Sequence, residues 1–430
     1  MTDVAAAGPN AVAVGAFDGT LDFGAGAMIQ PAGMGAYVVK LDSSGAPLWS
    51  KNYGTAGFSA TATSVAVDSV GDIFVLGDSG SSHVSDLGGT CTGFATPSYL
   101  AKLDGATGAC IWNVGIDTGA SLGVYGPTSV EVDTSGNVVF AVRGDQALEI
   151  TTTGGVETGA APAGFGAWLA KRDGATGSAI WTQVIDGAAD EHLSDLSISP
   201  VDGAVAMAGY TDGTSVTFPG GQNVSFTQVP FGFDGFVAQF DGATGEMTWV
   251  NLAQSTDSTF VEALTTTNSG DVVAVWTANG SVDFGGGPIT LDGVAIVTYS
   301  GLGAYQAARL FPTNGTGTLA NPDLAVAPNG EVRMTAGLFG TVDLGTGPIV
   351  ASTPSQYDVL VFSLDTSTGV VSWHSKSSAV GTAGQFPRID VAADGATLVG
   401  GARPSVLTFG TASLPFNGGP RDSYVVKLAP

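Results

Sequence analysis

The side chains in this sequence that could do chemistry are three histidines, two cysteines and many acidic residues. His83, His192 and His374 lie far apart in the chain without the spacing of metal ligands, and no His-Glu-x-x-His motif occurs. We therefore expect these histidines on the surface or in loops. A catalytic site would need residues that folding brings together, and Asp190-Glu191-His192 is a segment that a loop from elsewhere in the fold could meet.

The two cysteines, Cys91 and Cys110, are 19 residues apart. In an exported protein they could form one disulfide, whereas in a reducing compartment they would remain two small buried thiols. The spacing does not choose between these states, so the sequence leaves both open.

Asp-rich turns are the second candidate sites. Segments such as Asp68-Ser69-Val70-Gly71-Asp72 and Asp202-Gly203 could bind calcium through carboxylate and carbonyl oxygens. The same residues are also favoured in plain β-turns. Calcium is the one cofactor that the sequence suggests, and it stays an alternative to simple turns.

Arg143-Gly144-Asp145 matches an integrin-binding tripeptide. Recognition by an integrin needs an exposed loop tip, but this triplet directly follows an expected strand at 138–142. We interpret it as a chance match.

Composition narrows the fold class. The chain has 430 residues with 65 Gly and 20 Pro, and 44% of its residues are hydrophobic while only 12% are charged. Gly and Pro destabilise helices, so this composition predicts an all-β protein with a large core. The net charge is −25, from 38 acidic and 13 basic residues, and no cluster of Lys or Arg reverses it locally. We therefore expect neither nucleic acid nor an anionic membrane as a partner.

The N-terminus lacks the basic and apolar regions of a signal peptide, and no apolar run is long enough to span a membrane. Because the first expected strand begins almost at Met1, a signal peptide could have been removed. We expect a monomeric protein outside the cell or on its surface, with the periplasm as the other compartment.

One motif recurs along the chain: a strand ends in an acidic residue, a tight turn follows, and a second strand carries a tryptophan. The copies are Lys40-Leu41-Asp42 leading to Trp49, Lys102-Leu103-Asp104 to Trp112, Lys171-Arg172-Asp173 to Trp181, Gln239-Phe240-Asp241 to Trp249, and Ser363-Leu364-Asp365 to Trp373. From Asp to Trp the step is eight residues in four copies and seven in the first. This pattern predicts a β-hairpin in each copy.

A second anchor precedes each hairpin, a short alternating apolar segment followed by a turn glycine. The anchors begin at Val4, Val65, Val130, Leu196, Leu264, Leu324 and Ile389, in steps of 60–68 residues. They divide residues 1–430, as a single domain, into repeats 1–64, 65–129, 130–195, 196–263, 264–323, 324–388 and 389–430. Four antiparallel strands repeated around a ring bury both faces of every small sheet. We predict a seven-bladed β-propeller with four-stranded antiparallel blades; a sandwich array or an open solenoid is the alternative.

Two repeats depart from the pattern. In the fifth, Leu310 stands where a tryptophan is expected. The seventh reaches Lys427-Leu428-Ala429-Pro430 without a fourth strand. Either this blade has three strands, or the N-terminal segment completes it, or the missing strand lies outside these 430 residues.

At the Asp-x-x-Thr-Gly-x-x-x-Trp segments the chain resembles two propeller families. One is the quinoprotein-like group. The other is a group of bacterial cell-surface proteins with long repeats of the form Val-x-Val-Asp…Lys-Leu-Asp-x-x-Thr-Gly-x-x-x-Trp, and this resemblance covers the whole chain. It implies a secreted or surface-attached protein without a particular activity.

The quinoprotein resemblance implies a dehydrogenase only where a vicinal cysteine pair and acidic calcium ligands accompany the cofactor. Cys91 and Cys110 are not vicinal. What the resemblance carries over is therefore structural: tryptophans that pack between adjacent blades. These are Trp49, Trp112, Trp181, Trp249 and Trp373.

The longest variable connections, at 79–98, 144–167 and 211–235, fall in consecutive repeats. If they project from one rim, they form an asymmetric surface whose aromatic residues could contact a ligand. The alternative is that these side chains pack beneath their own loops. The candidates are Phe94, Phe165, Phe218, Phe226, Phe231 and Phe233.

The function that we expect from these features is a non-catalytic recognition or scaffold module that binds a protein or a glycan. The alternative is a hydrolase or lyase with an active site at the central channel, built from several blades. Clustered acids with shifted pKa values and a histidine at the channel would favour the enzyme, whereas exposed rim aromatics would favour binding. The sequence assigns no catalytic or metal-binding residue.

Overall fold

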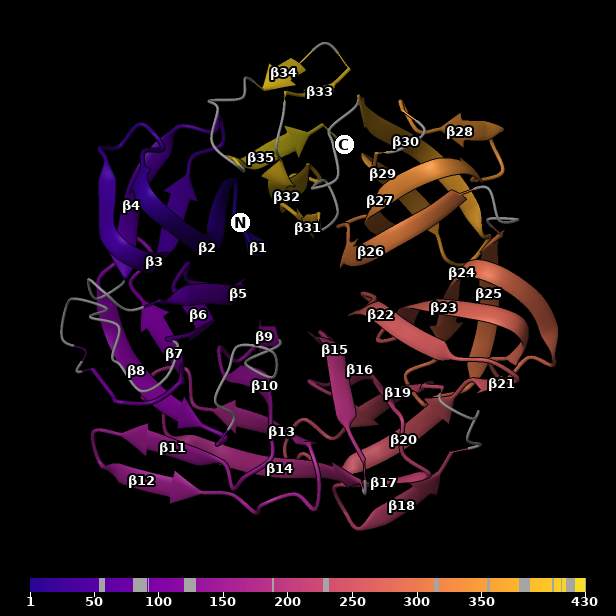
Figure 1. Cartoon of the computed structure of the whole chain (residues 1–430), viewed down its shortest axis with the longest axis horizontal. Helices are drawn as coiled ribbons and strands as arrows, with labels where there is room; N and C mark the ends of the chain where they lie inside the picture. Colours follow the sequence, from indigo (N-terminus) through magenta and orange to yellow (C-terminus); the bar gives the residue numbers. More distant parts are fainter. Residues whose placement is uncertain are drawn as a thin grey trace.

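The computed structural model describes residues 1–430 apart from 54–58, 80–90, 92, 120–128, 188, 227–231, 313–316, 354–355, 379–386, 404–405, 411, 415–421 and 430. In the described ranges every regular element is a strand, and no helix that could cross a membrane is found. Antiparallel sheets surround a central opening like the blades of a propeller (Figure 1). The prediction of an all-β propeller with antiparallel blades is confirmed.

Within each sheet the strands follow one another in chain order, and the first strand lies nearest the centre of the ring (Figure 1). The first sheet is β1 (Asp3–Ala7), β2 (Asn10–Leu21), β3 (Met28–Leu41) and β4 (Pro47–Tyr53), and the second is β5 (Thr61–Val67), β6 (Ile73–Asp78), β7 (Ser98–Leu103) and β8 (Cys110–Asp117). The third is β9 (Ser129–Val132), β10 (Val138–Gly144), β13 (Gly166–Arg172) and β14 (Ala179–Gly187), and the fourth is β15 (Glu191–Ile198), β16 (Val205–Thr211), β19 (Asp234–Phe240) and β20 (Met247–Leu252).

The remaining sheets continue round the ring. The fifth is β22 (Thr259–Thr266), β23 (Val272–Asp283), β24 (Ile289–Tyr299) and β25 (Tyr305–Pro312), and the sixth is β26 (Gly317–Val326), β27 (Val332–Asp343), β29 (Asp358–Asp365) and β30 (Val370–Ser378). The seventh has three described strands, β31 (Arg388–Val391), β32 (Thr397–Arg403) and β35 (Asp422–Leu428). All seven sequence anchors lie within these innermost strands, β1, β5, β9, β15, β22, β26 and β31.

Short strands from the variable connections enlarge some sheets. Three hairpins each add to the outer strand of the preceding sheet: β11 (Glu149–Thr152) and β12 (Gly155–Thr158) on β8, β17 (Ser215–Phe218) and β18 (Gln222–Ser225) on β14, and β33 (Leu407–Phe409) and β34 (Ala412–Leu414) on β30. In addition, β21 (Gln254–Ser255) pairs with β23, and β28 (Pro348–Val350) pairs with β27. Parts of the predicted inserts therefore join neighbouring sheets.

The recurring turn forms because its own side chains satisfy its backbone. The Asp104 carboxylate accepts hydrogen bonds from the backbone N and the Oγ1 of Thr107, at 2.8 and 2.6 Å. Gly108 follows with a φ of 69°, a conformation that glycine adopts at little cost. A Cβ at this position would lie 3.0 Å from the Trp49 ring of the preceding sheet, so the glycine also makes room for the tryptophan.

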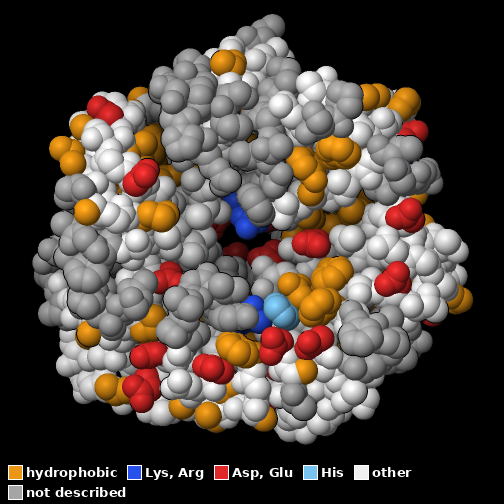
Figure 2. Space-filling model, viewed as in Figure 1, with side chains coloured by type: hydrophobic (Ala, Val, Ile, Leu, Met, Phe, Trp, Pro, Cys, Tyr) orange, Lys and Arg blue, Asp and Glu red, His pale blue; other side chains and the backbone are white. Residues whose placement is uncertain are grey.

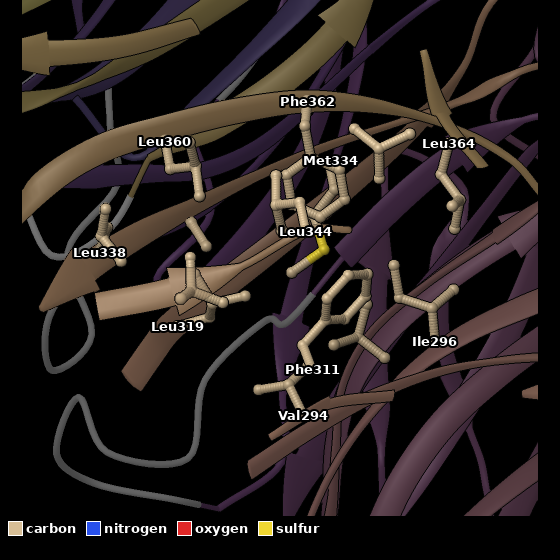
Figure 3. Close-up of a cluster of buried hydrophobic side chains, with 14 of the residues drawn as sticks. Val294, Ile296, Phe311, Leu319, Met334, Leu338, Leu344, Leu360, Phe362 and Leu364 are labelled. Atoms are coloured by element: carbon tan, nitrogen blue, oxygen red, sulfur yellow. The ribbon is translucent and has the colours of Figure 1, made fainter. Parts of the chain in front are cut away.

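The hydrophobic core lies between adjacent sheets rather than inside a single sheet. One cluster joins the fifth and sixth sheets, where Phe311 and Phe362 pack with their ring centroids 5.7 Å apart (Figure 3). Met334 and Leu360 complete its buried centre. Each blade therefore depends on its neighbours for burial of its apolar faces.

Four of the predicted tryptophans bridge neighbouring sheets. Each indole Nε1 donates a hydrogen bond to a backbone oxygen in the hairpin turn of the following sheet. The pairs are Trp49 with Gly105 at 3.3 Å, Trp112 with Gly174 at 3.0 Å, Trp181 with Gly242 at 3.2 Å, and Trp249 with Gly301 at 3.2 Å. Trp373 packs on the cluster between the sixth and seventh sheets, and the Arg333 guanidinium lies 4.7 Å from its ring centroid. Four of the five side chains therefore contact the following sheet, and Trp373 lies beside the cluster between the sixth and seventh sheets.

The fifth sheet corrects one expectation. In the hairpin of the third and fourth strands, each bridging tryptophan lies opposite the third-strand residue that directly precedes a register shift. Trp249 lies opposite Gln239 in this way. In the fifth sheet that position belongs to Ala307, opposite Thr298, and not to Leu310. A cavity of about 260 Å³ remains between Ala307 and the turn at 366–369.

The seventh sheet departs from the prediction of four strands per blade. The N-terminal segment does not complete it, because β1 pairs with β2 in the first sheet. Side-chain contacts join the ends of the ring instead: the N-terminal amine donates to Ser423 Oγ at 3.0 Å, and Arg388 Nε donates to the backbone oxygen of Thr2 at 3.2 Å. Six sheets of four or more strands and one of three therefore make up the described ring.

Candidate functional site at the mouth of the central channel

The innermost strands line the central channel, which encloses a cavity of about 290 Å³. Several of these strands are irregular near their beginnings, with register shifts at 62/64 in β5, 193/195 in β15, 261/263 in β22 and 320/323 in β26. The extra residues Thr63, Ser194 and Glu262 line the channel. Such bulges commonly direct side chains toward functional sites.

Three aspartates on the channel wall connect neighbouring blades. Asp3, Asp195 and Asp323 each accept a hydrogen bond from the next residue of their own strand and another from the following sheet. The cross-sheet donors are the backbone amides of Val65 at 2.8 Å, Leu264 at 3.0 Å and Ile389 at 2.9 Å. These carboxylates therefore hold the inner strands together, which is a structural role.

The aspartates on the channel wall are buried, and their negative charges repel one another. Burial raises the pKa of Asp3 and of Asp195 to about 7, and that of Asp390 to about 6. Arg388 lies among them and opposes the rise at Asp3 and Asp195. Figure 2 shows acidic side chains and a Lys or Arg side chain deep in the central opening.

An aromatic cluster lies beside the channel where β15 and β22 begin. The His192 imidazole stacks on the Tyr210 ring, with centroids 4.5 Å and planes 8° apart. Phe260 and Phe233 meet Tyr210 edge-on at 5.1 and 5.4 Å. All four rings are half-buried, so their remaining surface is accessible to a ligand. Figure 2 shows a histidine beside hydrophobic side chains at the edge of the opening, over the position of β15 and β16 in Figure 1.

Two charged residues border these rings. Arg143 is 6% exposed at the end of β10, and its Nε donates to the backbone oxygen of Glu191 at 2.7 Å, so the guanidinium spans the third and fourth sheets. Glu262 is exposed on the channel wall. We call Arg143, His192, Tyr210, Phe233, Phe260 and Glu262 the mouth cluster.

The mouth cluster keeps its imidazole and phenol neutral near pH 7. Burial lowers the pKa of His192 to about 4, and the positive charge of Arg143 acts in the same direction while Asp212 opposes it. Burial raises the pKa of Tyr210, where Arg143 opposes the shift and Glu262 adds to it. Both rings can therefore accept or donate hydrogen bonds without carrying a charge.

Glu191 supports the cluster from beneath. Its side chain is buried, and it accepts hydrogen bonds from the Gly187 amide at 3.0 Å and Thr211 Oγ1 at 3.3 Å. Burial raises its pKa to about 8, and Asp186 and Asp190 add to the rise. Glu191 thus fixes the start of β15 and does not face the accessible rings.

Of the other two histidines, the structure describes only His374, which lies outside this site. His374 is exposed on β30, and His83 lies outside the described residues. His192 was expected on the surface or in a loop, but it lies on strand β15 in the mouth cluster, where it meets the loop residue Phe233. Phe233 belongs to a connection of the same sheet as His192, so the alternative that ring closure brings a loop of another blade to residues 190–192 stays a prediction.

The predicted aromatic rim is only partly supported. Phe218 and Phe226 are buried in the core, where both pack against Phe236 at 5.4 and 6.2 Å, so they are not available to a ligand. Phe94 and Phe165 are half-buried. Phe231 lies outside the described residues, and Phe233 belongs to the mouth cluster.

Sequence reasoning missed Phe260, Tyr210 and Arg143 as site residues. A signal was present for Phe260, since both His192 and Phe260 stand four residues before the anchors Leu196 and Leu264. Tyr210 is found only through strand pairing, because it lies opposite His192 in the β15–β16 ladder. The buried guanidinium of Arg143 also rules out an exposed integrin-binding tip at this residue.

The Asp-rich turn at 68–72 uses its carboxylates within the protein. Asp68 Oδ1 accepts from the Asp72 amide at 2.8 Å, and Lys102 Nζ lies 3.0 and 3.1 Å from Asp68 and Asp72 carboxylate oxygens. The Asp202 carboxylate accepts a hydrogen bond from the backbone amide of Ala204 at 3.2 Å. Among the described residues, no group of three or more His, Cys, Asp or Glu side chains is arranged to hold a metal ion.

Cys91 and Cys110 form a disulfide, with Cα atoms 5.8 Å apart. The bond ties the connection between β6 and β7 to the start of β8. Disulfides persist mainly in oxidising compartments.

No known protein family matches the sequence, and no curated protein matches it either. Among solved structures, the polysaccharide lyase Uly1 is similar, with 9% identity, coverage of 99% of this chain and 89% of that chain, and a TM-score of 0.51. The europium-containing methanol dehydrogenase has 12% identity, covers 89% and 84%, and has a TM-score of 0.42. A quinohemoprotein alcohol dehydrogenase from Comamonas testosteroni has 11% identity, covers 99% and 76%, and has a TM-score of 0.36. At these identities the likeness concerns the propeller fold alone.

Proposed function

We propose that this protein is a secreted or cell-surface recognition propeller that binds a saccharide at the mouth cluster. The observation that carries the proposal is the group of four half-buried rings at the channel edge, in which Tyr210 contacts the other three, flanked by Arg143 and Glu262. Ligand sites combine apolar and aromatic surface with a few placed polar groups, and this cluster has that composition.

The chemistry of the site suits an amphipathic ligand. The exposed faces of Phe233 and Phe260 offer apolar area to the C–H face of a sugar ring. The neutral His192 and Tyr210 can exchange hydrogen bonds with hydroxyl groups, and Glu262 adds an acceptor on the channel side. A protein ligand is the other partner that the sequence suggested, and it would use the same rings.

The wider assignment combines several supporting features. The Cys91–Cys110 disulfide supports an oxidising compartment, either the extracellular space or the periplasm. We count the three-stranded sheet as the seventh blade of a monomeric ring. Binding of calcium at Asp-rich turns stays a prediction from the sequence.

The test is a panel of neutral and uronate-containing oligosaccharides, measured by isothermal titration with the intact protein. Phe233→Ala and Phe260→Ala should each weaken binding about tenfold, since each removes an aromatic face. Tyr357→Ala is the matched control, because Tyr357 is also a half-buried ring in an aromatic pair, with Phe339 at 5.4 Å, but lies outside the mouth cluster. Equal loss in all three variants, or no oligosaccharide bound, would contradict the proposal.

A lyase or hydrolase is the second candidate. The observation that favours it is the contact between two neutral proton-transfer groups, His192 and Tyr210, beside the cation Arg143. Uly1, whose fold is similar, is named as a polysaccharide lyase. Incubation of the bound oligosaccharide with the protein separates the candidates: new reducing ends with wild type and none with Tyr210→Phe support the enzyme, while an unchanged ligand supports recognition alone.

A further inference from the structure

The junction of the fifth and sixth sheets holds a cavity where four other junctions hold a tryptophan. Its volume is about 260 Å³, and Ala307 stands at the tryptophan position of the fifth sheet's hairpin. The buried side chains of Ile296 and Leu364 form the apolar part of its lining. Ser367 and Thr368 also line the cavity and are exposed, so a small molecule can reach it from solvent.

The turn glycine of the sixth sheet faces this cavity rather than an aromatic ring. In the second and third sheets, a Cβ built on Gly108 or Gly177 would lie 3.0 Å from the tryptophan of the preceding sheet. Among the described residues, a Cβ on Gly369 would have only the Cδ of Arg309 within 4 Å, at 3.8 Å. The space that an indole fills at the other turns therefore belongs to the cavity at this turn.

The same turn also presents a hydrogen-bond acceptor. Where the first sheet meets the second, the backbone oxygen of Gly105 accepts from Lys40 Nζ at 2.7 Å and from Trp49 Nε1 at 3.3 Å. The corresponding oxygen in the sixth sheet belongs to Thr366, which likewise follows the Asp that begins the turn. Thr298 stands in the place of Lys40 here and the tryptophan is absent, and no described residue donates a hydrogen bond to the Thr366 oxygen. This carbonyl is therefore available to a donor on a ligand.

Arg309 forms a fixed wall of the cavity. Its Nη2 donates to the backbone oxygen of Leu344 at 3.2 Å, and its guanidinium lies 5.5 Å from the ring centroid of Phe311. These contacts hold the aliphatic part of the side chain along one side of the cavity. An engineered apolar cavity of about 150 Å³ binds benzene, so this larger cavity has room for a molecule of two fused rings.

We propose that the cavity binds a small planar aromatic molecule with a ring N–H, of which indole is the simplest example. The ring would lie against Gly369 as the Trp49 ring lies against Gly108, and its N–H would donate to the backbone oxygen of Thr366. Apolar contact with the lining gives affinity, and the single acceptor gives specificity for a donor on the ring. The cavity shares no residue with the mouth cluster, so this site is independent of the proposed saccharide site.

The test compares indole with indene, which has the same two-ring shape but no N–H. In an NMR titration of the intact protein we expect one indole to bind per chain. Indene should bind about fivefold more weakly, because it leaves the Thr366 oxygen without a donor. With labelled alanine and leucine methyl groups, nuclear Overhauser contacts should join the indole ring to Ala307 and Leu364.

Two variants change the site in opposite directions. Ala307→Trp should weaken indole binding about tenfold, because the chain then supplies the ring itself. Trp181→Ala should open the equivalent space beside the Gly242 oxygen and bind a second indole. Equal affinity for indole and indene, Overhauser contacts that exclude Ala307, or unchanged indole binding by a folded Ala307→Trp protein would overturn the proposal. The first two measurements use the wild-type chain, so they decide the question even if a variant does not fold.

Discussion

The imidazole of His192 lies flat against the phenol ring of Tyr210, 4.5 Å away, on neighbouring strands of the fourth sheet. The two residues are directly opposite each other in the β15–β16 ladder, so their contact is set by strand register. Phe260 and Phe233 extend this pair toward the fifth sheet. The result is an aromatic surface beside a channel that is otherwise acidic.

The protonation state of His192 provides the first prediction. Its pKa of about 4 lies below the ordinary value of 6.5, since burial and Arg143 both disfavour the cation. In an NMR titration we expect His192 to stay neutral from pH 8 down to about 5. Arg143→Met should raise the titration midpoint, because it removes a neighbouring positive charge.

Asp212→Asn is the opposing control for this titration. Asp212 stabilises the imidazolium, so its neutralisation should lower the midpoint. Opposite shifts in the two variants would establish charge as the cause, whereas shifts in the same direction would indicate a change of packing.

Stability should fall as the pH rises from about 4 to about 7. In the unfolded chain Asp titrates near 3.8, but in the fold the pKa of Asp3 and of Asp195 is about 7 and that of Asp390 about 6. Between these values the unfolded chain has released protons that the folded state retains, so stability decreases with pH. Thermal unfolding should therefore show a midpoint a few degrees higher at pH 5 than at pH 8.

Asp195→Asn tests the source of this pH dependence. The variant removes a titrating carboxyl from the channel, so the difference between pH 5 and pH 8 should shrink. Asp241→Asn is the matched control: hydrogen bonds to Thr244 hold the pKa of Asp241 below its ordinary value, so this change should lower stability about equally at pH 5 and pH 8 and leave the difference between them unchanged. If both variants changed the stability difference between pH 5 and pH 8 equally, the channel carboxyls would not be the source of the pH dependence.

Blade junctions should respond in opposite ways to loss and gain of a tryptophan. Trp181→Ala removes a buried ring and its 3.2 Å hydrogen bond to Gly242, so we expect a loss of about 3 kcal/mol in urea unfolding. Ala307→Trp places an indole at the cavity of about 260 Å³ in the fifth sheet and should gain about 1 kcal/mol. A destabilised Ala307→Trp protein would show that this cavity cannot take an indole.

The disulfide should contribute measurably to stability. Cys91 and Cys110 close a loop with a sequence separation of 19, for which loss of the link costs about 3 kcal/mol. The Cys91→Ser/Cys110→Ser protein should unfold at lower urea, and reductant should lower the wild-type midpoint to match. A wild-type midpoint that reductant leaves unchanged would contradict this prediction.

Calcium binding can be tested by thermal unfolding in millimolar calcium and in EDTA. At the turn of residues 68–72 we expect no shift, because Lys102 already neutralises the carboxylates of Asp68 and Asp72. A higher midpoint in calcium that persists in Asp68→Asn would place a calcium site elsewhere in the chain.

Much of the architecture could be predicted because it depends on short sequence motifs that recur along the chain. Each Asp-x-x-Thr-Gly turn satisfies its own backbone, as Asp104 and Thr107 do, and so repeats wherever the motif repeats. Alternating apolar residues at the anchors specify strands with an apolar face that folding buries. These features determined the all-β class, the hairpins and the tryptophan junctions.

The aromatic rim illustrates the limit of that reasoning. Phe218, Phe226 and Phe233 belong to the same variable connection, and composition does not distinguish them. Phe218 and Phe226 became core residues because the β17–β18 hairpin folds back over the third and fourth sheets. Phe233 precedes β19 at the channel side and stayed accessible.

The sequence by itself thus determined the repeating unit, since turns and strand periodicity depend on residues close together in the chain. Tertiary structure alone decided the mouth cluster. Arg143, His192 and Phe260 come from three successive sheets, and their proximity depends on ring closure and strand register. No local pattern encodes those long-range distances, because they are set by how many blades close the ring and how each packs on the next.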